Sequence, residues 1–306
     1  MFNEANNKKL HSSWLLAALV APVTQTASNC SWPSVALVAV LCLVINYGME
    51  KLQVERTTGR WVGAIQWLWM LLVISEFMHW VMYCWPNYEN YHVVPVALLL
   101  LAAYAVSKGT KTAARAGSAL KAALLSLFGV ILFAGIREVH LENLKPVWQM
   151  QTAHLITAML IPVMGFRYGA WKGKRKVIGY ALGVSVITAG VMSLAYVRMV
   201  EAPFYELSRG ISIFGTDLRL ESLVAAGMTL GYYVLLSYLI GITADAWEPE
   251  KHRVRSIWIS ALFAGLVFIS GMRLNSRLLA IGNLVIWSVI PILKNIGKNM
   301  KLVLDK

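Results

Sequence analysis

Few ionisable side chains interrupt the apolar stretches of this sequence, and those that do are the first candidates for chemistry. Glu76 is the only acidic residue deep inside such a stretch. A charged group at the centre of a membrane costs roughly 2.5–3.5 kcal/mol, so it usually faces other protein groups and serves a function. His79 follows three positions later, on the same face of a helix. The two residues predict either a pair that binds a ligand or a proton, or a structural pair near one membrane surface.

Two proline-interrupted segments are the second candidate site. Proline removes a helical hydrogen bond, and the freed backbone groups can then face a ligand. The exposed N–H end of a broken helix suits a carboxylate, and the exposed carbonyl end suits an ammonium group. The alternative is a pair of ordinary kinked helices, which membranes tolerate. The candidate ligand contacts at the two breaks are Pro22, Val23, Thr24, Pro162, Val163, Met164 and Gly165.

The composition requires a membrane environment for these groups. Of the 306 residues, 58% are hydrophobic and only 14% are charged. A soluble domain carries about 25% charged and about 45–50% apolar residues. The composition therefore excludes a soluble globular protein, a disordered protein and a small disulfide-stapled scaffold. We expect an integral membrane protein with the lipid bilayer as its solvent.

The apolar residues fall into ten segments of a length near that of a membrane-spanning helix. The segments cover residues 12–26, 33–49, 61–84, 93–107, 119–135, 153–166, 177–197, 219–244, 255–271 and 278–293. No linker divides them, so residues 1–306 are expected to form one all-α transmembrane domain of about ten helices. The proline breaks lie in the first and sixth segments, which predicts two inverted repeats of five spans each, 12–135 and 153–293.

Basic residues predict the orientation of the chain in the membrane. If the segments alternate across the bilayer, 21 of the 28 Lys and Arg residues lie on the side of the N-terminus and 7 on the opposite side. Cytoplasmic loops carry the excess of Lys and Arg, so both termini are expected in the cytoplasm. The same rule explains the net charge of +13 without nucleic acid, which we do not expect as a partner.

Nothing in the sequence predicts catalysis, a metal site or a cofactor. No acyl-transfer, zinc-protease or phosphate-loop motif occurs, and the carboxylates do not pair on one helical face at one depth. Cys30, Cys42 and Cys84 match no metal-binding spacing. A disulfide between Cys30 and Cys84 is one option, and two free thiols are favoured over it. The N-terminus lacks the cleavage site of a signal peptide.

An ordered set of short motifs resembles the spore germination permease family, the integral-membrane B subunit of nutrient germinant receptors. The motifs are His92-Val93-Val94-Pro95, Ala102 to Gly109, Val139 to Pro146, Ile74-Ser75-Glu76-Phe77, Phe204-Tyr205-Glu206-Leu207 and Arg219 to Leu223. The similarity covers most of the chain and is strongest over 70–150 and 200–240. The chain differs from the family pattern in four ways. It is somewhat short, it lacks the Arg expected before Glu76, its first segment contains no glycine, and Val94 replaces the threonine expected before Pro95.

The resemblance implies the LeuT-like fold of the amino acid–polyamine–organocation transporter superfamily, and a receptor subunit in the spore inner membrane that senses a small germinant. A larger membrane subunit and a lipoprotein subunit are the implied partners. In this fold the eighth span lines the ligand site, which adds Tyr232 and Ser237 to the candidate contacts. The apolar, narrow set of contacts predicts a small neutral amino acid as the ligand. An amino-acid or amine permease of the same fold is the alternative.

Overall fold

The computed structural model describes residues 60–85, 89, 92–136, 140–144, 203–209, 212–213, 216–217, 220–247 and 253–270, with single positions or short pieces at 36–51, 187–191 and 290–297. Helices build almost all of the described part, which confirms an all-α protein at that level. The elements are α3 (Arg60–Cys84), α4 (Val93–Ser107), α5 (Thr110–Gly135), η2 (Leu141–Leu144), α8 (Pro203–Arg209), β1 (Ser212–Ile213), β2 (Thr216–Asp217), α9 (Glu221–Trp247) and α10 (Arg253–Ile269).

The long helices follow the apolar segments closely, with one difference. Helix α5 begins at Thr110 rather than near residue 119. Its first turns are rich in Ala, Lys and Arg, which are strong helix formers but add little hydropathy. Gly109 makes the short turn between α4 and α5 with a φ of 119°, a left-handed conformation that glycine adopts at no steric cost.

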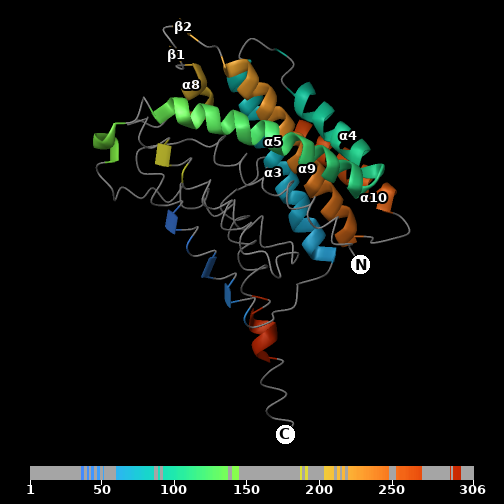
Figure 1. Cartoon of the computed structure of the whole chain (residues 1–306). Helices are drawn as coiled ribbons and strands as arrows, with labels where there is room; N and C mark the ends of the chain where they lie inside the picture. Colours follow the sequence, from blue (N-terminus) through green and yellow to red (C-terminus); the bar gives the residue numbers. More distant parts are fainter. Residues whose placement is uncertain are drawn as a thin grey trace.

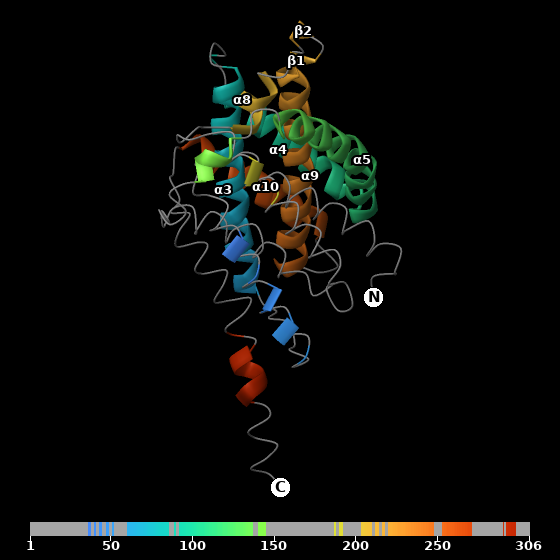
Figure 2. The same cartoon turned by 60° about the vertical axis from the view of Figure 1, so that its left-hand side comes forward.

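Helix α9 is the centre of the described core. It contacts α3, α4, α5, α8 and α10, and its contact with α3 is the most extensive between any two described elements. Figures 1 and 2 show α3 and α9 side by side, with α5 crossing beside them and α8 near the beginning of α9. The side chains of α9 are buried almost continuously from Gly231 to Gly241, as expected for a helix surrounded by other helices.

Small residues bring α10 close to its neighbours. Its buried side consists of Ser256, Ile257, Ser260, Ala261, Ala264 and Gly265. Small residues four positions apart allow helix backbones to approach closely, which is how helices pack inside membranes. The opposite side of α10 exposes large apolar residues, among them Ile259, Leu262 and Leu266.

Contacts between helix ends show that α10 runs opposite to α4 and α9. His92 at the start of α4 lies against Phe268 at the end of α10, with 6.0 Å between the ring centroids. At the opposite ends, a Cβ on Gly241 of α9 would lie 3.6 Å from Val106 of α4 and 4.0 Å from Arg253 of α10. The ends of α4 and α9 and the start of α10 therefore lie together on one side, and the start of α4 lies beside the end of α10 on the other.

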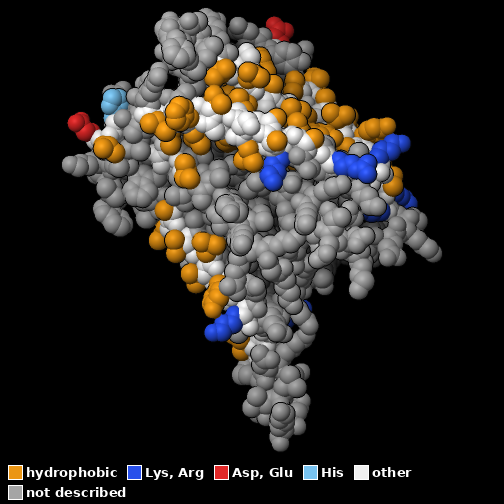
Figure 3. Space-filling model, in the orientation of Figure 1, with side chains coloured by type: hydrophobic (Ala, Val, Ile, Leu, Met, Phe, Trp, Pro, Cys, Tyr) orange, Lys and Arg blue, Asp and Glu red, His pale blue; other side chains and the backbone are white. Residues whose placement is uncertain are grey.

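An ion pair closes the turn between α9 and α10. Arg253 Nε donates to Asp245 Oδ1 at 2.6 Å. Figure 3 shows further Lys and Arg side chains at the edge of the molecule where α4 and α10 lie. Exposed basic residues of these helices and of the nearby start of α5 include Lys108, Arg115 and Arg255.

One described helix meets the length and composition of a membrane span. This helix is α9, over Glu221–Asp245. Shorter apolar helices run over Met70–Cys84, Val93–Ser107 and Ala119–Phe133. The ten-span architecture stays a prediction, because several of its segments fall outside the described residues.

Candidate functional site

The described residues include only part of the site predicted from the sequence. The contacts at the two proline breaks, which are Pro22, Val23, Thr24, Pro162, Val163, Met164 and Gly165, all lie outside them. Glu76 lies in α3, but the position of its side chain is not among the described features. Its predicted neighbour His79 is exposed. Tyr232 and Ser237 both lie in α9 and are buried.

Ser237 differs from the two threonines of α9 in its hydrogen bonding. Thr229 donates to the carbonyl of Ala225, and Thr243 donates to the carbonyl of Leu239, each at 2.8 Å. Such bonds to the preceding turn are the usual way for a hydroxyl inside a helix to find a partner. Ser237 is 2% exposed, yet its Oγ makes no hydrogen bond within the described structure. A buried polar group in this state is an exception that calls for an explanation such as a ligand.

Tyr232 lies on a different side of α9 from Ser237. Its ring lies against that of Phe77 of α3, with 4.7 Å between the centroids. Residues five positions apart on an α-helix point roughly 140° away from each other. The structure therefore places Tyr232 toward α3 and does not bring it onto one face with Ser237.

Aromatic residues continue from Tyr232 along α3. Phe77, Trp80 and Tyr83 are three positions apart, so they share one face of the helix. Tyr205 of α8 makes edge contacts with Trp80 and Tyr83, at 5.8 and 5.9 Å between ring centroids. We call Phe77, Trp80, Tyr83, Tyr205 and Tyr232 the aromatic column. It runs from the buried interior of the α3–α9 contact to the end of α3.

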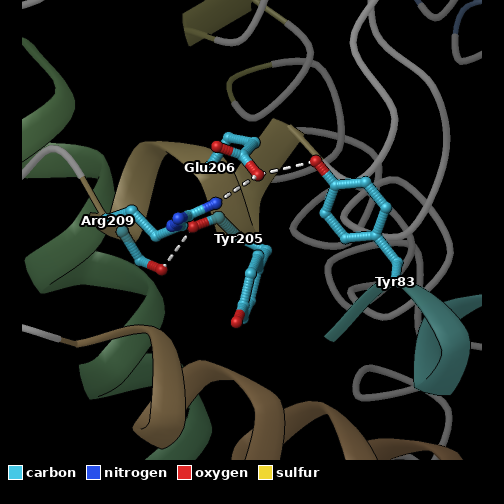
Figure 4. A network of polar contacts seen from close by, with 5 residues as sticks. Tyr83, Tyr205, Glu206 and Arg209 are labelled. Atoms are coloured by element: carbon cyan, nitrogen blue, oxygen red, sulfur yellow. Dashed lines mark hydrogen bonds and ion pairs between the residues drawn. The ribbon is translucent and has the colours of Figure 1, made fainter. Parts of the chain in front are cut away.

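A polar network lies at the end of the aromatic column that is nearest the end of α3, which we call the outer end of the column (Figure 4). The Tyr83 hydroxyl donates to Glu206 Oε1 at 2.6 Å, and Arg209 Nη1 donates to the same oxygen at 3.3 Å. The short bond between a hydroxyl and a carboxylate belongs to the stronger class of hydrogen bonds. The ion pair adds little, because the Arg209 side chain is exposed. Tyr83 and Glu206 thus fasten α8 to the end of α3.

Helix α8 is also held by apolar packing. Ser208 is fully buried and donates to the carbonyl of Tyr205 at 2.6 Å. A Cβ on Gly135 of α5 would come within 2.6 Å of the end of the Leu207 side chain, so a larger residue there would require this side chain to shift. Burial raises the pKa of the Tyr205 phenol, and nearby acidic groups, with Cys84 the largest of them, act in the same direction. Tyr205 is therefore a neutral hydrogen-bonding group at physiological pH.

Sequence reasoning missed Trp80, Tyr83 and the role of Glu206. The spacing of Phe77, Trp80 and Tyr83 was a usable signal, because three aromatic residues at helical intervals mark one face. Their contact with Tyr205 had no such signal, since it joins positions more than a hundred residues apart. Cys84 has a free, buried thiol. No cluster of three or more potential metal ligands occurs among the described residues.

Comparison with known proteins adds no assignment to this geometry: no protein-family model and no curated protein matches the chain. The resemblance to spore germination permeases therefore depends on the ordered motifs of the sequence. One of these motifs, Phe204 to Leu207, forms most of α8 and supplies the aromatic ring and the carboxylate described above.

Proposed function

We propose that the chain is the integral-membrane subunit of a spore nutrient germinant receptor, which binds a small neutral amino acid and triggers germination. The observation that carries the proposal is the order of its motifs, from Ile74-Ser75-Glu76-Phe77 through Val139 to Pro146 and on to Arg219 to Leu223. No single motif is specific to the family, but the order of the motifs along one chain is specific.

One described residue favours such a ligand. Ser237, in the middle of α9, is buried and makes no hydrogen bond within the described structure. Binding sites for small molecules combine apolar walls with a few polar groups of this kind. The neighbouring buried residues of α9 are mostly apolar, which favours a small ligand with an aliphatic side chain over a strongly charged one.

The exposed surface supports a location in a membrane. Large apolar side chains lie on the outside of several helices, including Phe133 of α5 and Leu266 of α10. In water such a surface would be unusual for a monomer, whereas lipid chains cover it readily. The proposal places the chain in the bacterial cytoplasmic or spore inner membrane, with both termini cytoplasmic and with ten spans in two inverted halves.

The proposed receptor includes other subunits. A larger membrane subunit and a lipoprotein subunit would complete it, and the small-molecule germinant would be its ligand. The genes beside this one provide a direct check. Genes for both partner types next to it support the proposal, and a lone gene among metabolic genes contradicts it.

Deletion of the gene from its host tests the function directly. Spores of the deletion strain and of a complemented strain are exposed to single L-amino acids, and the loss of optical density is followed. We expect the deletion strain to lose its response to at least one neutral amino acid and the complemented strain to regain it. Unchanged responses to all of them would contradict a receptor role.

A transport assay separates this function from that of a permease. Proteoliposomes that contain the chain are loaded with an unlabelled neutral amino acid, and uptake of the labelled form is measured. A receptor is expected to give no counterflow above empty vesicles. Rapid counterflow together with unchanged germination would favour an amino-acid or amine permease.

A further inference from the structure

Two buried tryptophans of α3 differ in their hydrogen bonding. Trp67 Nε1 donates to the backbone carbonyl of Ser260 in α10 at 3.0 Å. Trp80 is more deeply buried, at 3% exposure against 9% for Trp67. Nevertheless Trp80 Nε1 is shielded from solvent and makes no hydrogen bond within the described structure. The same helix thus carries one indole N–H with a structural partner and one without.

A buried indole N–H without a partner is unusual. Buried Trp side chains normally place this group against an acceptor, because leaving a donor unsatisfied in a low-dielectric interior is unfavourable. The ring that lies nearest among the described contacts of Trp80 is that of Tyr205, which meets it edge to face.

We infer that the Trp80 Nε1–H group binds the ligand of this protein by donating a hydrogen bond to one of its carboxylate oxygens. The inference rests on the proposed function, in which the ligand is a small neutral amino acid. It assigns the carboxylate end of that ligand to the contact between α3, α8 and α9, near the outer end of the aromatic column.

The surroundings of Trp80 fit this assignment. The ring of Tyr205 meets Trp80 edge to face, and Phe77 lies one turn earlier on the same face of α3, so apolar ring surface lies beside the indole. A hydrogen bond to a charged acceptor is stronger than one between neutral groups, and more so in a dry environment. Such a contact would give a ligand with a carboxylate an advantage over the corresponding amine.

The two tryptophans form a matched pair for the experiment. The variants Trp80→Phe and Trp67→Phe each remove one indole N–H and keep an aromatic ring. The full chain is purified in detergent, and its thermal unfolding is measured in titrations with L-alanine, L-valine and the corresponding amines, ethylamine and isobutylamine. The midpoints without ligand report stability, and their dependence on ligand concentration reports the Kd.

We expect both variants to unfold at a lower temperature than the parent, because phenylalanine leaves part of the buried indole volume empty. The drop should be smaller for Trp80→Phe, which loses no hydrogen bond, than for Trp67→Phe, which loses one. The Kd of Trp80→Phe for the amino acid should rise by about tenfold or more, as expected for the loss of one hydrogen bond to a charged group. Trp67→Phe should keep the parental Kd. In the parent, the amine should bind more weakly than the amino acid.

Three outcomes would contradict the inference, and they can be told apart. A parent that binds neither amino acid would contradict the proposed function itself. Trp80→Phe with the parental Kd would contradict only the contact at Trp80. Trp80→Phe that is as destabilised as Trp67→Phe, with no change in Kd, would mean that this indole N–H has a structural partner.

Discussion

At the residue scale, the hydroxyl groups of α9 can be compared with one another. Thr229 and Thr243 donate to their own helix, whereas Ser237 does not. A side chain that makes no hydrogen bond contributes little to folding through its polar atom. Its presence in the middle of a buried helix then points to another role, and the proposed ligand supplies one.

The first prediction concerns Ser237→Ala, with Thr243→Val as its control. We expect Ser237→Ala to keep or slightly raise the thermal stability, because it removes an unsatisfied buried hydroxyl. Thr243→Val removes a hydroxyl that makes a hydrogen bond, and it should lower the free energy of unfolding by about 0.5–1.5 kcal/mol. In spores, only Ser237→Ala should raise the germinant concentration for half-maximal response. Equal losses of stability in both variants, with no change in the germination response, would show that Ser237 has a structural role.

The second prediction concerns the bond between Tyr83 and Glu206. Tyr83→Phe removes the hydroxyl that donates at 2.6 Å and leaves the ring contact with Tyr205 in place. We expect the free energy of unfolding to fall by about 1 kcal/mol. Such a small value is expected for a hydrogen bond to a charged group when the site is only half-buried. Thermal unfolding measures the change.

A control for Tyr83→Phe lies on α4. Tyr104 has an exposed side chain that lies beneath Lys108, so Tyr104→Phe should change stability by no more than about 0.5 kcal/mol. If Tyr83→Phe is as harmless as this control, the hydroxyl does not hold α8 against α3.

What the sequence could predict at this scale depends on the separation of the partners. Ser237 and Tyr232 are predicted contacts because the resemblance points to the eighth span, and both are buried in α9. Trp80 and Tyr83 are visible as an aromatic spacing on one helix. Glu206, in contrast, owes its role to Tyr83, which lies far away in the sequence. Contacts of this kind follow from the packing of helices, which local pattern does not determine.

At the element scale, hydropathy predicted the long helices well and the short ones not at all. The bounds of α3 and α4 agree with the apolar segments 61–84 and 93–107 to within a residue. Helix α8 has seven residues, and the β1–β2 ladder has two residues in each strand. Elements this short bury too little surface to leave a periodic signal, so only their tertiary contacts define them.

The third prediction concerns the contact between α5 and α9. A Cβ on Gly227 would lie 2.9 Å from Leu127 and 3.0 Å from Leu124. Both contacts are with the ends of flexible side chains, so Gly227→Ala should cost less than about 1 kcal/mol after its gain in helix propensity. Gly227→Leu cannot be accommodated in this way and should cost roughly 1–3 kcal/mol or more. Thermal unfolding compares the two variants.

Gly265 of α10 serves as the control for Gly227. A Cβ there would meet Leu99 at 3.7 Å, an ordinary van der Waals distance. Gly265→Ala should therefore be neutral, or stabilising by about 0.4–1 kcal/mol because it restricts the unfolded chain. If Gly227→Leu were tolerated as well as Gly265→Ala, α5 and α9 would not be in close contact at this point.

At the scale of the whole molecule, α9 joins the described helices into one bundle. Helix α3 packs against α9, and α4 packs against both α9 and α10, more extensively against α9. Helix α3 runs opposite to α9, and α4 runs opposite to α10, as two inverted repeats of five spans predict for the third and eighth and for the fourth and ninth segments. Because α4 also packs extensively against α9, which is not its predicted equivalent, the contacts do not single out these pairs, and the inverted repeat stays a prediction.

The final prediction tests how this bundle is oriented in the membrane. Thr112→Cys and Lys145→Cys are placed one at a time in a chain whose three native cysteines are replaced by alanine. Intact cells are then treated with a membrane-impermeant maleimide. We expect labelling at position 145 but not at 112, because Lys108, Arg115 and Arg255 lie at helix ends on one side and cytoplasmic loops retain such charges. Permeabilised cells should label at both positions, which controls for access. Labelling of 112 alone in intact cells would invert the orientation, and labelling of both would break the predicted alternation of spans.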